Sequence, residues 1–214
     1  MGVLIGFLFF QSSLSLLSVN LVLSLIYKIF FITILAVLFL TDLKKMFIPD
    51  RIILPSLVIG LILSLGITIY KIGYLYYFLL QNPVGKFLLP PHSDYFLRHA
   101  FYAAEPALTG ILMAILIGGF FWGLIIITKG KGMGGGDVKL GAFMGLMLGF
   151  PQALIALILS FLIGAIFSII LIIFGKKHLG QTIPFGPFLV LGSLIVLFWG
   201  EKILNWYLNL SIGT

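Results

Sequence analysis

Long runs of apolar residues, separated by short polar segments, dominate this sequence. Residues 1–41 are almost continuously apolar, and further apolar runs cover 52–70, 106–127, 151–174 and 183–200. A helix that crosses the hydrocarbon core of a bilayer needs roughly 20 such residues. Charged residues make up only 9% of the chain, whereas a soluble domain carries about 25%. We therefore expect an all-α fold, a polytopic transmembrane helix bundle.

The apolar runs predict about seven spans, one of them short. Residues 1–41 are too long for one crossing and are expected to hold two. The division falls either at Ser18 to Asn20 or at Tyr27 and Lys28, and we favour the second. The stretch from Leu140 to Phe150 is the short span. Because the N-terminal residues lack a basic region and a small-residue cleavage site, we expect a retained helix.

The whole chain, 1–214, is expected to form one membrane-embedded domain. Segment 71–105 contains tyrosines, prolines and mixed charge, and is predicted to be an extracytoplasmic loop. Segment 128–137 is predicted to be a glycine-rich cytoplasmic loop. We expect the net charge of +7 to serve orientation and contact with lipid headgroups, and not nucleic-acid binding.

The distribution of the cations predicts the orientation. One side of the expected bundle carries eight Lys and Arg residues and the other carries five, so the first is assigned to the cytoplasm. The eight are Lys44, Lys45, Arg51, Lys129, Lys131, Lys139, Lys176 and Lys177.

Two acidic residues directly adjoin apolar helices. Asp42 closes the run ITILAVLFLT, and Asp137 opens the run VKLGAFMGLMLG, so both are expected near the same depth and on the same face. A carboxylate at the centre of a bilayer costs about 2.5–3.5 kcal/mol, and less near the interface. Each residue on its own is compatible with a helix cap. Two such acids in a chain with few charges favour a function.

The segment before Asp137 is unusually rich in glycine. Gly132, Gly134, Gly135 and Gly136 precede the acid in the sequence GMGGGD. Glycine removes side-chain bulk, which lets a backbone approach a helix or an extended peptide closely. A flexible turn between helices is the simpler interpretation, but it does not require an acid that leads into a short helix of small residues.

Two carboxyl groups that share one proton can hydrolyse a peptide bond. The ionised group takes a proton from the attacking water, and the protonated group donates a hydrogen bond to the carbonyl oxygen. The chain has no cysteine, and its three histidines lie in predicted loops. We expect no metal site, no cofactor and no other catalytic set.

The stretch DLKKMFIPD, residues 42–50, and the later GMGGGDVKL, residues 132–140, together resemble the paired signature of the type IV prepilin peptidases. These enzymes are GxGD-class intramembrane aspartic proteases. IPFGPFLVLG, residues 183–192, resembles the last sequence block of that family. The resemblance extends over roughly residues 25–210. It implies that Asp42 and Asp137 are the catalytic pair.

The resemblance also implies the substrate and its location. Prepilins and pseudopilins lose a basic leader at the cytoplasmic face of the inner membrane, so we expect a substrate helix in the bilayer and its leader near the glycine loop. Gly132, Gly134, Gly135 and Gly136, with Pro49 and Lys139, are the candidate substrate-binding residues. The absence of cysteine argues against the zinc-binding CxxC domain of many members, and against N-methyltransferase activity.

Other interpretations remain open. Asp50 is expected to cap a helix, and Lys139 either anchors the chain at the interface or tunes the pKa of Asp137. An ion- or proton-coupled transporter that uses the same two aspartates is the main alternative function, and a structural subunit is a third. The sequence does not indicate the oligomeric state.

Overall fold

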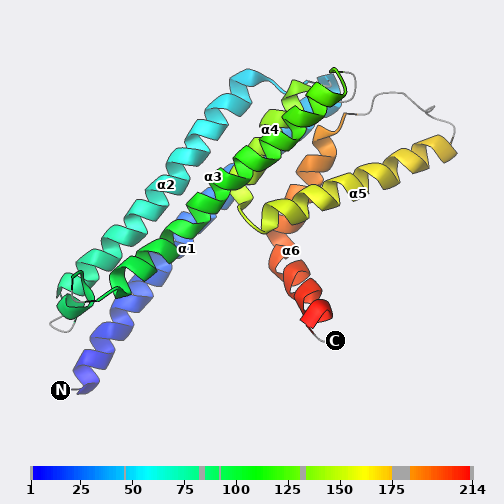
Figure 1. Ribbon diagram of the computed structural model, residues 1–214. Helices are drawn as coiled ribbons and strands as arrows, with labels where there is room; N and C mark the ends of the chain where they lie inside the picture. Colours follow the sequence, from blue (N-terminus) through cyan, green and yellow to red (C-terminus); the bar gives the residue numbers. More distant parts are fainter. Residues whose placement is uncertain are drawn as a thin grey trace.

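The computed structural model describes residues 2–45, 47–81, 85–91, 93–130, 134–174 and 184–212 (Figure 1). Its elements are α1 (Gly2–Lys45), α2 (Asp50–Gln81), the 3-10 helix η1 (Gly85–Leu88), α3 (Tyr95–Ile127), α4 (Gly135–Leu148), α5 (Gln152–Ile173) and α6 (Gly186–Ile212). Within these ranges there is no strand. Helices α1, α2, α3, α5 and α6 are long and apolar enough to cross a membrane. The predicted all-α, multi-pass membrane architecture is confirmed.

The first apolar region is one helix and not two. Helix α1 continues for 44 residues, so the division that we expected at Tyr27 and Lys28 is wrong. The physical reason is that no glycine or proline occurs between Gly6 and Pro49, and a lysine does not break a helix. With five candidate spans and the shorter α4, the total of about seven spans is not confirmed.

The segment that connects α2 and α3 is shorter than the predicted loop 71–105. Helix α2 continues to Gln81, and α3 already begins at Tyr95, so Pro106 lies inside α3 and does not start it. Three prolines of the sequence, at 83, 90 and 91, fall between the end of α2 and the start of α3. At the other end of the chain, α6 continues beyond Gly200, where the last apolar run ends, to Ile212.

Helix α4 lies in the middle of the fold. It contacts α2, α3, α5 and α6, while α5 and α6 diverge from the long helices α1, α2 and α3 (Figure 1). Its side chains Leu140, Phe143 and Met144 are fully buried. A helix that is buried on all sides has no polar face, which explains why a 14-residue apolar stretch forms an internal helix.

Glycines bring α4 close to α3. A Cβ atom added at Gly145 would lie 2.6 Å from the backbone carbonyl of Met113, and one added at Gly141 would meet the ring of Phe121 at 2.5 Å. Small residues permit this close approach between membrane helices. Neither position tolerates a side chain, so the packing fixes where the N-terminus of α4 lies.

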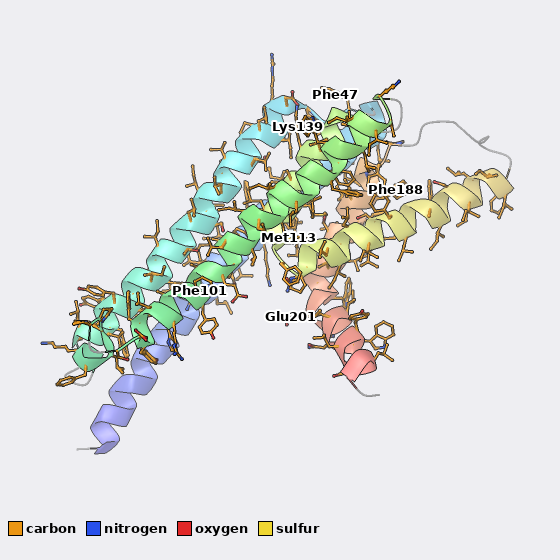
Figure 2. The ribbon with its side chains drawn as sticks, viewed as in Figure 1. Phe47, Phe101, Met113, Lys139, Phe188 and Glu201 are labelled. Carbon is orange, nitrogen blue, oxygen red and sulfur yellow. The ribbon has the colours of Figure 1, made fainter. Side chains whose placement is uncertain are left out.

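Figure 2 shows the two ends of the molecule. Lys139, near the start of α4, lies at the same end as Phe47, which follows α1, whereas Glu201 and Phe101 lie far from it. The end of α1 and the starts of α2 and α4 therefore lie together at one end of the bundle (Figure 1). We call it the Asp42/Asp137 end of the bundle.

Candidate active site

Asp42 lies in the last turn of α1 and is buried. Only 5% of its surface is exposed, although a helix terminus normally faces solvent. The start of α6 covers it: the backbone amide of Gly186 lies against the carboxyl group, and a Cβ atom added at Gly186 would collide with Oδ2. Among the described residues, no group makes a well-aligned hydrogen bond to this buried Oδ2. The carboxyl group is therefore tightly packed, and its Oδ2 atom lacks a well-aligned hydrogen bond.

Asp137 lies in the first turn of α4 and is 9% exposed. Gly134 precedes the helix in an extended conformation (φ −85°, ψ 153°). Its carbonyl accepts a hydrogen bond of 3.1 Å from the Asp137 backbone N–H, and the Gly134 backbone also hydrogen-bonds to the Asp137 carboxyl group. A short glycine turn thus holds the acid at the N-terminus of a buried helix.

The two carboxyl groups interact electrostatically. Asp137 belongs to α4, which is not among the five candidate spans. Burial and, to a smaller extent, the negative charge of Asp42 raise the pKa of Asp137 from 3.8 to about 6. The hydrogen bond from Gly134 opposes this rise. Such a pair favours the state that carries one proton up to about pH 6. We refer to Asp42 and Asp137 as the carboxyl pair.

The glycines before Asp137 differ in what surrounds them. A Cβ atom added at Gly136 would lie 2.9 Å from the Cβ of Ile48, so Gly136 is needed for contact with the segment that follows α1. Gly134 and Gly135 are exposed, and nothing lies within 4 Å of a Cβ added at Gly135. The predicted loop is shorter than 128–137, because α4 begins at Gly135. Gly132 lies outside the described residues.

Asp50, Lys139 and Pro49 lie at the same end but outside the carboxyl pair. Lys139 Nζ forms an ion pair of 2.5 Å with Asp50 Oδ1, and these side chains are 33% and 54% exposed. Lys139 therefore pairs with α2, although we had considered that it tunes Asp137. The Pro49 carbonyl accepts hydrogen bonds of 3.0 and 3.2 Å from the N–H groups of Ile52 and Ile53, which starts α2.

Neither Gly186 nor Ile48 was predicted from the sequence as an individual site residue. The block IPFGPFLVLG had been assigned only by resemblance. In the structure, the ring of Phe185 packs against Phe161 of α5 in a tilted arrangement, with the centroids 4.9 Å apart. It also packs edge-to-face against Phe121 of α3, with the centroids 6.0 Å apart. This aromatic cluster fixes the start of α6, and it thereby places Gly186 against Asp42. A glycine between an aromatic residue and a proline was the available signal.

Comparisons with known proteins identify the family of this chain. Residues 29–169 match the model of the type IV leader peptidase family, and this range includes both members of the carboxyl pair. The chain belongs to the type IV leader peptidase family. No solved structure matches it.

Curated relatives of the leader peptidase family align with most of this chain. The prepilin leader peptidase/N-methyltransferase of Aeromonas salmonicida is 34% identical over 82% of this chain and 50% of its own length. The protein of the same name from Pseudomonas aeruginosa is 30% identical over 80% of this chain and 49% of its own length. The one from Bacillus subtilis is 27% identical over 86% and 59%. The chain spans about half the length of the curated relatives it matches.

Proposed function

We propose that this chain is a membrane aspartic endopeptidase that removes the basic leader of type IV prepilins or pseudopilins. The observation that carries the proposal is the carboxyl pair: two buried acids from α1 and α4 that interact electrostatically at one end of the bundle. The names of the relatives, which include prepilin leader peptidase, supply the substrate class. We further propose that the protein lies in the inner membrane, with the Asp42/Asp137 end at the cytoplasmic face.

The carboxyl pair would catalyse hydrolysis with one shared proton. The ionised carboxylate accepts a proton from a water molecule as the water oxygen attacks the peptide carbonyl carbon. The protonated carboxyl group donates a hydrogen bond to the carbonyl oxygen and stabilises the developing charge. When the tetrahedral intermediate collapses, a proton passes to the leaving amine and the C–N bond breaks. We assign the retained proton to Asp137, because the pKa of that group is raised to about 6.

The open glycines next to Asp137 support a place for the substrate backbone. Gly134 and Gly135 present no side chain, and the space beside Gly135 is free. An extended peptide can approach such a backbone closely. We propose that the leader lies along these two residues, so that the bond to be cut faces the carboxyl pair. The apolar helix of the substrate would then lie in the bilayer against the enzyme.

The other activities considered from the sequence have less support. No comparison supports an ion- or proton-coupled transporter. The N-methyltransferase part of the relatives' name belongs to proteins about twice as long as this chain, and we do not extend it to this one.

A processing assay in membranes tests the proposal. The chain is co-expressed with a tagged prepilin, and leader removal is followed by the change in electrophoretic mobility and by N-terminal sequencing. We expect cleavage at a single bond next to the basic leader. Absence of cleavage for a panel of prepilins and pseudopilins, with the enzyme present in the membrane, would contradict the proposed function.

A further inference from the structure

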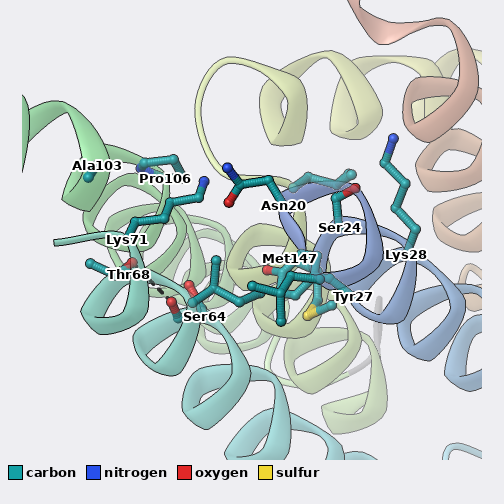
Figure 3. A pocket seen from close by; sticks show the side chains of 13 residues that line it. Asn20, Ser24, Tyr27, Lys28, Ser64, Thr68, Lys71, Ala103, Pro106 and Met147 are labelled. Carbon is teal, nitrogen blue, oxygen red and sulfur yellow. Dashed lines mark hydrogen bonds between the residues drawn. The ribbon is translucent and has the colours of Figure 1, made fainter. Parts of the chain in front are cut away.

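A second polar site lies far along the bundle from the carboxyl pair. It is an open pocket of about 200 Å³ that residues of α1, α2, α3 and α4 line (Figure 3). Lys28 of α1 is 14 residues from Asp42, and Lys71 of α2 is 21 residues from Asp50. At 1.5 Å per residue these separations are about 21 and 32 Å along the helices. Since a bilayer core is about 30 Å thick, the cavity lies towards the opposite leaflet.

The charge of this cavity is entirely positive. Its lining includes Lys28 and Lys71 but no acidic residue. In the part of the chain that the structure describes, neither lysine forms an ion pair, whereas Lys139 does. Figure 3 shows the two lysines on opposite sides of Asn20 and Ser24, with Lys71 extending towards Asn20. Two ammonium groups at the edge of an apolar bundle attract an anion.

The uncharged polar groups of the cavity offer mainly hydrogen-bond acceptors. Oδ1 of Asn20 is buried and has no hydrogen-bond partner among the described residues. The Ser24 hydroxyl donates to the Leu21 carbonyl at 2.8 Å, and the Thr68 hydroxyl donates to the Ser64 carbonyl at 3.0 Å. Their protons are thus used inside their own helices, and their oxygens remain available as acceptors.

We propose that this cavity binds the phosphoglycerol headgroup of an anionic phospholipid from the leaflet opposite the Asp42/Asp137 end. The phosphate would lie against the ammonium group of Lys71, which extends towards Asn20, and Lys28 on the other side of Ser24 would add to the positive potential. The glycerol hydroxyls supply the donors that Asn20 Oδ1 lacks. The apolar part of the lining, which includes Leu23 and Ile67, would contact the start of an acyl chain. No group of the proposed peptidase mechanism takes part, so the site is independent of the proposed function.

Lipid retention by the purified full-length chain tests this site. The protein is incubated with mixed micelles of phosphatidylglycerol and phosphatidylcholine, repurified, and its bound lipid is quantified by mass spectrometry. We expect phosphatidylglycerol to be enriched over phosphatidylcholine. The double variant Lys28→Gln/Lys71→Gln should weaken phosphatidylglycerol binding about thirtyfold, since each lysine near a membrane surface contributes about a factor of five.

A matched control removes the same number of charges elsewhere. The variant Lys86→Gln/Lys202→Gln should retain phosphatidylglycerol like the unmodified chain, because neither residue lines the cavity. A second variant, Asn20→Ala, keeps both charges. It should reduce the preference for phosphatidylglycerol over phosphatidic acid, whose headgroup lacks glycerol hydroxyls. This variant also tests the site if the double lysine variant does not fold.

Three results would overturn the proposal. One is equal retention of phosphatidylcholine by the unmodified chain, and another is equal loss of lipid in the two double variants. The third is displacement of the lipid by millimolar inorganic phosphate, which would show a site for free phosphate instead of a headgroup.

Discussion

Two arrangements of acidic residues lie at the Asp42/Asp137 end of the bundle, and they differ in burial and in the charge of their partners. Asp42 and Asp137 are 5% and 9% exposed, and the negative charge of Asp42 acts on Asp137. The Asp50 side chain is 54% exposed and is paired with Lys139. An exposed ion pair costs little and contributes little, whereas buried acids without a cation oppose folding. From this difference we propose that the carboxyl pair serves chemistry and that the ion pair serves local structure.

The largest expected effect comes from removing one acid of the carboxyl pair. Asp42→Asn and Asp137→Asn should each lower the rate of leader removal by at least about 10²–10⁴-fold, because each deletes a proton-transfer group. Both variants should insert into the membrane normally. The measurement is single-turnover cleavage of a purified prepilin. Retained cleavage in either variant would exclude that residue from the mechanism.

Substitution of the glycines that border the carboxyl pair should have the next largest effect. An added methyl group at Gly186 would collide with Asp42 Oδ2, and one at Gly136 would collide with Ile48. We expect Gly186→Ala and Gly136→Ala to lower stability by about 1–3 kcal/mol, as overpacking typically does. Both should also slow cleavage, because the displaced groups border the carboxyl pair. Cleavage rate and thermal stability are both measured.

The matched control for the glycine substitutions is Gly135→Ala. Nothing lies within 4 Å of the added Cβ atom in the structure, and alanine favours a helix over glycine, so stability should not fall. If Gly135→Ala destabilised the protein as much as Gly136→Ala, the described contact between Gly136 and Ile48 would not explain the effect.

The pH dependence should report the carboxyl pair and not the ion pair. The pKa of Asp137 is raised from 3.8 to about 6, so the folded chain keeps a proton that the unfolded chain has lost. Stability should therefore fall as pH rises from about 4 to about 6, and Asp137→Asn should reduce this dependence. The value of kcat/KM should decline above an apparent pKa of about 6. A decline that already begins near pH 4 would contradict the shared proton.

The smallest effect is expected at the exposed ion pair. Asp50→Asn and Lys139→Gln should each change stability by less than about 1 kcal/mol and should leave most of the cleavage activity. The same single-turnover assay compares them with the Asp42 and Asp137 variants. An inactive Asp50→Asn enzyme would reverse the comparison and would make Asp50 part of the reaction.

Local chemistry explains which parts of the fold were predictable. The helices α2 and α5 follow from apolar runs, and the prolines between α2 and α3 predict a break there. The continuity of α1 was missed because Lys28 was interpreted as an interface anchor, although it is a residue that a helix tolerates. The acids could be identified because charge beside an apolar run is rare in this sequence.

Contacts between distant segments could not be predicted. Gly186 is 144 positions from Asp42 in the sequence, and only the packing of Phe185 against α3 and α5 brings the two together. The partner of Lys139 was also out of reach, since spacing suggested Asp137 and the helix geometry selects Asp50. Hydropathy and motif spacing contain no information about either contact.

The most direct test of the account is whether Asp42 and Asp137 meet in the membrane. The chain contains no cysteine, so the double variant Asp42→Cys/Asp137→Cys can be oxidised without competing thiols. A disulfide forms only when the two Cβ atoms can approach to about 4 Å. Ile48→Cys/Gly136→Cys is the positive control, because a Cβ atom added at Gly136 lies 2.9 Å from the Cβ of Ile48. Asp42→Cys/Glu201→Cys is the negative control. The account predicts a reducible cross-link in the first two variants and none in the third. A cross-link in the positive control, but none between positions 42 and 137, would contradict it.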